Sequence, residues 1–380
     1  MIVVGVDASN IRAGGGITHL GQLLAAADLE ALGVRVLVWG GAYTLGCLPD
    51  RSRLEKLHVQ LLDRTLPVRM AWQRWMLPRC LAQHSCDVLF SPGGTLPTAP
   101  GLPCVVMSQN LLPFEPAEAR RFGASFMRVK MLLLRASQKR SFEQAQGTIF
   151  LTRYAHDTVR AQLDRAPGKV AIIPHGIEER FFGGLKCRGE SFSPSRPLRL
   201  LYVSIVDVYK HQWHVAEAVA ALRLKGVPLW VEFVGPCYRP AGKRLADAIR
   251  RLDPAGEFLK YTGPLSFERL EEKYQKADAF VFASSCENLP NILLEAMATG
   301  LPIACSGSGP MPEVLGEGGV YFNPERPEEI AQAIMRLYQD GALRTRLALQ
   351  ARQAARSFSW ERCARETFSF IAQVACGNGR

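Results

Sequence analysis

The segment SSCENLPNILLEAMATGLP, residues 284–302, holds two glutamates whose spacing could do chemistry. Glu287 follows serine and cysteine and precedes an asparagine and proline stretch, whereas Glu295 lies eight positions later in an apolar run. Gly300 and Pro302 end that run, which predicts a loop around Glu287 followed by a helix that contains Glu295. The free N–H groups at the helix start, around Asn291, would favour an anion. The segment therefore predicts two hydrogen-bond acceptors at different depths along one bound molecule.

Two further stretches carry residues suited to phosphate. Lys210, in VSIVDVYKHQW, stands just before a helical stretch, where its ammonium could approach a phosphate or simply be solvated. Three consecutive glycines, Gly14, Gly15 and Gly16, follow the first strand-like run and precede an apolar-periodic helix. Without Cβ atoms, such a loop can turn tightly and present backbone N–H groups to a phosphate or sugar, although it is not GxGxxG.

Three polar residues complete the candidate set. Gln109 and Asn110 leave the end of a strand-like run, and their neutral amides suit sugar hydroxyls as well as ordinary loop structure. His175, in IPHGI, could donate to a ligand or make a structural hydrogen bond.

Short β-branched runs alternate with segments long enough for helices, which indicates βαβ units and a parallel sheet. In the first half these runs cover residues 2–7, 34–39, 87–90, 103–108, 147–152 and 169–174. After a glycine, serine and proline rich break at 177–197, which we interpret as a linker, the alternation restarts. The second set covers residues 198–204, 228–235, 258–263, 279–284, 302–306 and 319–323. We expect two doubly wound domains with ligands at the carboxyl ends of their strands, in a cleft between the domains.

Composition sets the class of protein. The chain has 380 residues, of which 48% are hydrophobic and 21% charged, typical of a globular protein with two domains. No signal peptide or membrane-spanning helix is predicted from the N-terminal MIVVGVD or the short run at 132–135. The ten cysteines form no CxxC pair, which favours reduced thiols in the cytoplasm.

Positive charge is concentrated in the first half of the chain. Residues 1–190 contain 23 basic and 15 acidic residues, net +8 of the total +11. Within them, residues 120–140 hold seven basic residues and no acidic one, with Phe122, Phe126, Val129 and Leu133 at helical spacing. Such a helix can lie on an anionic membrane surface, or it can be an ordinary packed helix with a solvated basic face. No aromatic and basic interleaving or recognition motif points to nucleic acid.

These segments together resemble the retaining glycosyltransferases of family 4. ENLPNILLE is similar to the family's E-x7-E motif, and IPHGI stands where the family often has a proline, asparagine, glycine, valine run. Residues 307–334 resemble the usual carboxyl-terminal signature, and 358–372 resemble the closing helix that crosses back to the first domain. The resemblance implies an α/β GT-B fold with two facing Rossmann-like domains.

The resemblance also implies a domain plan and a reaction. Residues 1–176 would bind the acceptor, 177–197 would be the linker, 198–357 would bind the nucleotide sugar, and 358–380 would return to the first domain. The donor would be a GDP-, UDP- or dTDP-sugar, and the acceptor a saccharide, often lipid-linked at the cytoplasmic membrane face. The transferred hexose, such as mannose or rhamnose, would be used in bacterial surface polysaccharide. Front-face displacement would retain configuration, and the leaving diphosphate would help to deprotonate the acceptor hydroxyl. No metal or other cofactor is expected, because the sequence has no DxD motif or His and Cys ligand cluster.

By the same resemblance, Glu287 would contact hydroxyls of the transferred sugar and Glu295 the ribose hydroxyls. Lys210 matches the phosphate-binding lysine, and Gly15 and Gly16 would approach the diphosphate or sugar from the other domain. Glu287, Lys210 and Gln109 form the expected catalytic set. The remaining predicted contacts are Asn288, Leu289, Pro290 and Asn291 with the donor, and Asn110 and His175 with substrate.

Two positions depart from the family pattern. Ile205 stands where an arginine is common, so a bidentate diphosphate contact is missing or supplied elsewhere. Gln109 stands where many members carry a histidine, and an amide cannot accept a proton as imidazole can. Another GT-B enzyme, such as a nucleotide-sugar epimerase or a phosphorylase, and a catalytically silent sugar-nucleotide-binding partner subunit therefore remain alternatives.

Overall fold

The computed structural model describes residues 1–12, 14–97, 100–183 and 191–377. The chain divides into two compact units. Unit 1 comprises Met1–Glu115, Ala124–Gly176 and Phe358–Arg380, and unit 2 comprises Pro116–Gly123 and Ile177–Ser357. Each unit is built around one parallel sheet.

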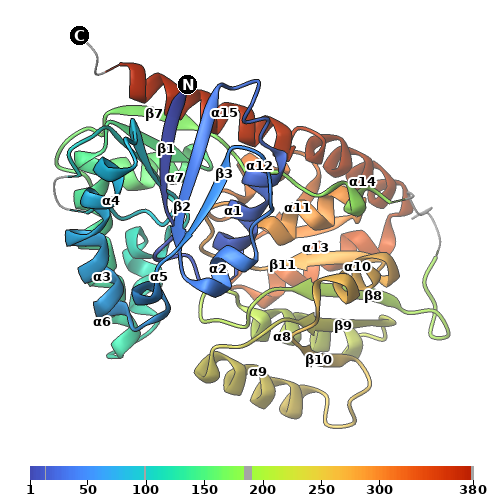
Figure 1. Cartoon of the computed structure of the whole chain (residues 1–380). Coiled ribbons are helices and arrows are strands. Elements are labelled where there is room, and N and C mark those ends of the chain that lie inside the picture. Colours follow the sequence, from blue (N-terminus) through green and yellow to red (C-terminus); the bar gives the residue numbers. More distant parts are fainter. Residues whose placement is uncertain (13, 98–99, 184–190, 378–380) are drawn as a thin grey trace. The chain divides into compact units, whose positions relative to one another are not determined.

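Unit 1 contains a seven-stranded sheet in the order β3-β2-β1-β4-β5-β6-β7 (Figure 1). All neighbouring strands pair in parallel. The strands are β1 Ile2–Asp7, β2 Val34–Gly40, β3 Leu54–His58, β4 Val88–Ser91, β5 Cys104–Met107, β6 Gly147–Phe150 and β7 Lys169–Ile172. Because the order reverses direction between β1 and β4, the carboxyl ends of these two strands mark the usual ligand position of such a sheet.

The helices of unit 1 cover this sheet. They are α1 Gly15–Ala26, α2 Ala42–Gly46, α3 Leu66–Trp75, α4 Leu77–Gln83, α6 Phe126–Gln144, α7 Arg153–Arg160 and α15 Trp360–Cys376, with 3-10 turns η1 Gln60–Asp63 and η2 Leu112–Phe114. Ser125, Thr152 and Ser359 cap α6, α7 and α15 by accepting a backbone N–H bond, which satisfies a donor that the helix itself cannot.

The last helix, α15, packs against α1 and against β4, β5 and β6. Two glycines permit this close approach. A Cβ at Gly176 would lie 2.2 Å from the backbone nitrogen of Trp360, and one at Gly147 would lie 2.7 Å from Val374 Cγ2. A side chain at either position would push α15 away from the sheet.

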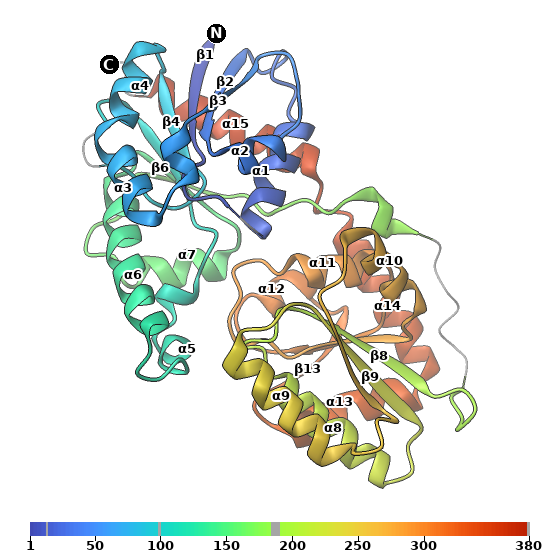
Figure 2. The ribbon, with the colours of Figure 1, turned by 60° about the horizontal axis from the view of Figure 1, so that its bottom comes forward.

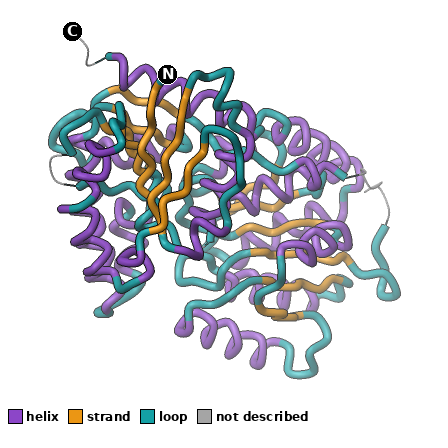
Figure 3. The backbone as a smooth tube through the Cα atoms, viewed as in Figure 1, coloured by secondary structure: helices purple, strands orange, loops and turns teal. Residues whose placement is uncertain are grey.

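Unit 2 repeats the plan with a six-stranded sheet in the order β10-β9-β8-β11-β12-β13 (Figure 2). Its strands are β8 Leu198–Val203, β9 Leu229–Val234, β10 Leu259–Gly263, β11 Ala279–Phe282, β12 Ile303–Ser306 and β13 Gly319–Phe322, again all parallel. Its helices are α5 Pro116–Arg120, α8 Gln212–Leu224, α9 Arg239–Leu252, α10 Phe267–Lys276, α11 Asn291–Ala298, α12 Met311–Leu315, α13 Pro327–Gln339 and α14 Gly341–Ala355, with the turn η3 Glu179–Phe182. Figure 3 shows helices packed around the strands of each unit.

The two predicted parallel α/β sheets are confirmed. The strand β3 was missed, because LEKLH carries Glu55 and Lys56 and forms the edge of its sheet. The expected single helix over 120–140 is wrong. Residues 120–123 belong to unit 2, and α6 begins only at Phe126.

Candidate functional site

Two loops leave the carboxyl ends of β8 and β11, the strands between which the order of unit 2 reverses. Residues 204–211 follow β8 and residues 283–290 follow β11. Ligands bind outside strand ends at such a reversal. The topology therefore brings the predicted Lys210 loop and the predicted Glu287 loop to one place.

Lys210 and Glu287 make direct contact within this place. Lys210 Nζ donates to Glu287 Oε1, and the side chains of Lys210 and Glu287 are only 5% and 14% exposed. The ammonium also lies 5.2 Å from the ring centre of Tyr209 and 5.3 Å from that of Phe282. The two residues predicted to hold phosphate and sugar separately are thus partners of each other in this structure.

Backbone and side-chain bonds tie the two loops together. Ser285 N donates to Tyr209 O at 2.9 Å, and His211 Nε2 lies 3.0 Å from Ser285 Oγ. His211, the residue just before α8, is in the left-handed conformation, with φ of 50°. Burial lowers the pKa of His211 to about 3, so its ring is neutral at neutral pH. Ser285 and His211 were missed from sequence, where a serine and a histidine in polar loops carry no distinguishing signal.

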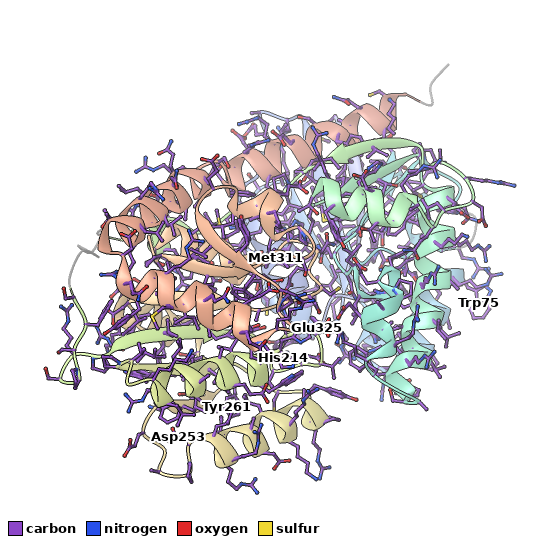
Figure 4. All side chains as sticks on the ribbon, turned by 180° about the vertical axis from the view of Figure 1, so that it is seen from behind. Trp75, His214, Asp253, Tyr261, Met311 and Glu325 are labelled. Atoms are coloured by element: carbon purple, nitrogen blue, oxygen red, sulfur yellow. The ribbon has the colours of Figure 1, made fainter. Side chains whose placement is uncertain are left out.

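A second set of charges borders these loops. Ser285 Oγ donates to Glu118 Oε2 at 2.6 Å, and Arg121 forms ion pairs with both Glu118 and Glu325. The Arg121 guanidinium lowers the pKa of Glu325. Figure 4 shows Glu325 next to His214, whose Nδ1 lies 3.1 Å from Pro324 O. Arg121 is therefore held in unit 2 by its ion pairs. The prediction that it belongs to a basic helix face over 120–140 is wrong.

Glu295 lies in α11 as predicted and is buried. Tyr274 Oη donates to Glu295 Oε2 at 2.8 Å. Burial raises the pKa of Glu295 to about 7, while the bond from Tyr274 and the charge of Arg180 act in the opposite direction. Tyr274 was missed from sequence, because a tyrosine on the amphipathic helix α10 reads as packing.

The residues between the two glutamates form the start of α11. Asn288 and Leu289 are each 7% exposed, and Pro290 precedes the first helical residue, Asn291. Asn291 Oδ1 is buried and has no hydrogen-bond partner among the described residues. This buried amide oxygen could accept a hydrogen bond from a ligand that carries a hydroxyl or N–H group.

Ile205 occupies the position of the missing arginine. Its side chain is 38% exposed, and its carbonyl accepts from Gln212 Nε2 at 3.0 Å. The structure thus places an apolar, partly exposed side chain in the same loop as Lys210.

In unit 1 the glycine loop and Gln109 come together. Gly14 has φ of +61°, and α1 begins at Gly15. A Cβ at Gly16 would lie 3.3 Å from Gln109 Oε1, whereas one at Gly15 would meet nothing within 4 Å. The glycines therefore leave open space at Gly15 and allow the amide of Gln109 to approach Gly16.

Two buried histidines extend this group. His19 Nδ1 lies 3.0 Å from Gln109 Nε2, and the ring centre of His19 lies 4.5 Å from that of His175. Burial lowers the pKa of His19 to about 3 and that of His175 well below its usual value. His19 stands within the glycine segment but was not singled out. Asn110 is engaged locally, because its Oδ1 accepts from Leu112 N at 3.1 Å.

Comparison with known proteins identifies the family of the chain. Residues 13–181 match the model of Glycosyltransferase Family 4, and residues 197–340 match that of Glycosyl transferases group 1. The chain is 32% identical over 112 residues to O-antigen chain mannosyltransferase B of Escherichia coli, covering 30% of this chain and 29% of the relative. It is 32% identical over 221 residues to a D-inositol 3-phosphate glycosyltransferase of a Nocardioides species, covering 54% and 48%. The chain thus spans about half or less of the length of these curated relatives.

Solved structures share the fold. Sucrose-phosphate synthase from Thermosynechococcus elongatus superposes with a TM-score of 0.76 at 17% identity, covering 100% of both chains. HepE of Anabaena in complex with UDP-glucose gives a TM-score of 0.71 at 16% identity, covering 97% of this chain and 100% of the other. With two Rossmann-ordered sheets and matches to both family models, the chain belongs to the family 4 glycosyltransferases and has the GT-B fold.

Proposed function

We propose that this protein transfers a hexose, such as mannose or rhamnose, from a nucleotide sugar to a saccharide acceptor. Unit 2 binds the donor and unit 1 binds the acceptor. The observation that carries the proposal is the buried contact between Lys210 and Glu287 at the strand reversal of unit 2. This contact joins one cation and one acceptor at the usual ligand position of a Rossmann-ordered sheet.

The chemistry of these two residues suits a sugar diphosphate. A phosphate would take Lys210 as a counterion and free Glu287 to accept from sugar hydroxyls. Glu295 would accept from the ribose hydroxyls, and Asn288, Leu289, Pro290 and Asn291 would line the donor between them. HepE, with its bound UDP-glucose, supports a donor of this class.

In the proposed reaction the acceptor hydroxyl attacks the anomeric carbon from the face that the diphosphate leaves, so configuration is retained. The bond from the anomeric carbon to the diphosphate oxygen breaks, and the leaving oxygen takes the hydroxyl proton. Lys210 stabilises the charge that develops on the diphosphate, a kind of contribution worth about 10²-fold to 10³-fold in rate. Gln109, held by His19 beside Gly16, would orient the acceptor, with His175 as a further contact. We expect no metal requirement.

We further propose a lipid-linked acceptor at the cytoplasmic face of the inner membrane, in bacterial surface polysaccharide synthesis. The similarity to an O-antigen chain mannosyltransferase supports a role in polysaccharide synthesis. The basic segment within 120–140 supports contact with an anionic surface.

Product analysis tests the reaction. Purified protein is incubated with GDP-, UDP- and dTDP-sugars and a saccharide acceptor, and the glycoside is examined by NMR for its anomeric configuration. We expect one donor class to yield a product with the donor's configuration, with or without EDTA. Inverted product, a need for free phosphate, or nucleotide release without a glycoside would contradict the proposal.

Variants test the residue roles. We expect Glu295→Ala to weaken nucleotide binding, and Glu287→Ala to reduce transfer more than binding. Normal turnover by both variants would contradict the site.

A further inference from the structure

Large apolar side chains are exposed on one part of unit 1. Of the sixteen exposed large hydrophobic residues in the described part of the chain, eight come from α3, its end, or α6. We call them the α3–α6 surface: Leu66, Met70, Trp75, Met76, Phe126, Val129, Leu132 and Leu133. Exposed apolar residues scattered singly are ordinary, but a concentration of this size marks an interaction site.

Helix α6 buries Met131 and Phe142 but leaves several other apolar side chains exposed. Gln138 and Ser141 are buried, and Ser141 Oγ accepts from Leu96 N at 2.9 Å. Phe126 and Leu133 instead point outward, with 82% and 68% of their surface exposed. Of the apolar stripe predicted from sequence, Phe122 is buried, whereas Phe126, Val129 and Leu133 are exposed. The interpretation of an ordinary packed helix is therefore wrong for these three residues.

Helix α3 contributes a second exposed group. Figures 1 and 2 both show α3 and α6 next to each other in unit 1, and Figure 4 shows Trp75 projecting from the ribbon. Trp75 is 61% exposed, although Trp72 on the same helix is buried. The surface thus combines an aromatic side chain and aliphatic side chains from two helices.

Positive charge predominates beside these side chains, and the one acidic residue of α6, Glu143, lies near the end of the helix. Residues 64–86 contain four basic and no acidic residues, and residues 119–142 contain seven basic and no acidic residues. No ion-pair partner is found among the described residues for Arg74, Arg79, Arg128, Lys130, Arg135 and Arg140. Cations without an ion-pair partner, next to apolar side chains, complement a lipid bilayer, whose headgroups are anionic and whose interior is apolar.

We propose that the α3–α6 surface docks the protein onto an anionic lipid bilayer. Trp75, Phe126 and Leu133 enter the headgroup and acyl boundary, and Arg128, Lys130 and Arg135 contact lipid phosphates. In the described part of the chain, no helix is long and apolar enough to cross a bilayer, so α6 would lie along the interface. A second copy of the chain fits this surface poorly, because a two-fold interface would bring the same basic residues together.

Vesicle binding tests this proposal, and it is measured with neither donor nor acceptor, so its result is independent of sugar transfer. The full chain is sedimented with phosphatidylcholine vesicles that contain or lack phosphatidylglycerol. We expect binding only with phosphatidylglycerol and weakening by salt. Trp75 fluorescence should shift to the blue on binding, and this shift should vanish in Trp75→Phe.

Matched variants assign the binding to the surface. Phe126→Ala/Leu133→Ala should weaken vesicle binding about tenfold or more, because buried apolar area is lost. Arg128→Gln/Lys130→Gln/Arg135→Gln should weaken it about fivefold for each charge removed. Leu224→Ala/Leu349→Ala and Arg250→Gln/Arg251→Gln/Arg346→Gln remove exposed side chains of the same kinds from unit 2 and should leave binding unchanged.

Three results would overturn the proposal. These are no binding to anionic vesicles, equal binding by the α3–α6 variants and their controls, or a dimer in solution that Phe126→Ala/Leu133→Ala dissociates. Circular dichroism and unchanged melting temperatures establish that the compared variants are folded.

Discussion

Lys210 and Glu287, 77 positions apart in sequence, form a buried ion pair at the carboxyl ends of β8 and β11. A buried ion pair costs desolvation free energy that its own attraction offsets only when the geometry is good. The pair therefore places a cation and a hydrogen-bond acceptor side by side. A bound phosphate would contact Lys210, and a bound sugar would contact Glu287. Much of the proposed donor chemistry follows from this one contact.

Removing one partner should be more damaging than removing both. We expect Lys210→Ala to lower the free energy of unfolding by about 3 kcal/mol, because Glu287 is left buried without its cation. Lys210→Met/Glu287→Gln should recover part of that loss while transfer stays absent. Denaturant titration of the single and double variants measures the coupling.

The exposed pair Arg35 and Glu55, 2.7 Å apart, is the matched control. Its removal should change stability by less than about 1 kcal/mol. Equal effects at the two pairs would show that the Lys210 contact contributes no more to stability than an ordinary surface pair.

The pKa of Glu295 predicts opposite pH effects on stability and on nucleotide binding. Its folded pKa, about 7, is above the ordinary 4.5, so the folded protein holds its proton more tightly than the unfolded chain does. The resulting stabilisation is present below pH 4.5 and is lost as pH rises through about 7, on the order of 3 kcal/mol.

Nucleotide affinity should instead rise through about pH 7, because the proposed acceptor for the ribose hydroxyls is the ionised carboxylate. Calorimetric titration of the nucleotide from about pH 5.5 to about pH 8.5, a range that spans this pKa, measures the change in affinity. Glu295→Gln should flatten both profiles. A pH profile unchanged in Glu295→Gln would exclude this group as its source.

An added cation at position 205 should strengthen diphosphate binding. Ile205→Arg places a guanidinium at a partly exposed site beside the Lys210 loop and should tighten binding of the nucleoside diphosphate about tenfold. Ile205→Gln, polar but uncharged, is the control and should bind like the wild type. Equal affinities for the arginine and glutamine variants would mean that this position does not reach the diphosphate.

His19 should act through the orientation of Gln109. His19 Nδ1 lies 3.0 Å from the Gln109 amide nitrogen, which leaves the Gln109 oxygen directed toward Gly16. We expect His19→Leu to lower kcat with little effect on donor affinity, and His19→Asn, which keeps an acceptor, to restore part of kcat. If the asparagine variant were no better than the leucine variant, packing alone would explain the role of His19.

The fold was largely predictable because buried parallel strands leave a strong signal. Short apolar runs of aromatic and β-branched residues, such as AFVF in β11, are typical of strands buried on both faces. The edge strand β3 escaped because solvent on one side permits Glu55 and Lys56. Helix α6 was misjudged because periodicity reveals an apolar stripe but not whether that stripe faces the core.

The residues of the proposed site can be chosen from sequence, but their contacts cannot. Glycine, lysine and glutamate patterns identified Gly16, Lys210 and Glu287, yet their partners come from distant segments. Spacing alone cannot place Ser285 beside His211, or Tyr274 beside Glu295, because these contacts depend on strand order.

A thermal-shift comparison of the wild type and Lys210→Ala with GDP, UDP, dTDP and their sugars tests the central claim most directly. A ligand at about 100 times its Kd adds about 2.7 kcal/mol to the folded state. We predict that one nucleotide class raises the melting temperature of the wild type by several degrees and leaves that of Lys210→Ala unchanged. No shift with any nucleotide, or the same shift in both proteins, would contradict donor binding at Lys210 and Glu287.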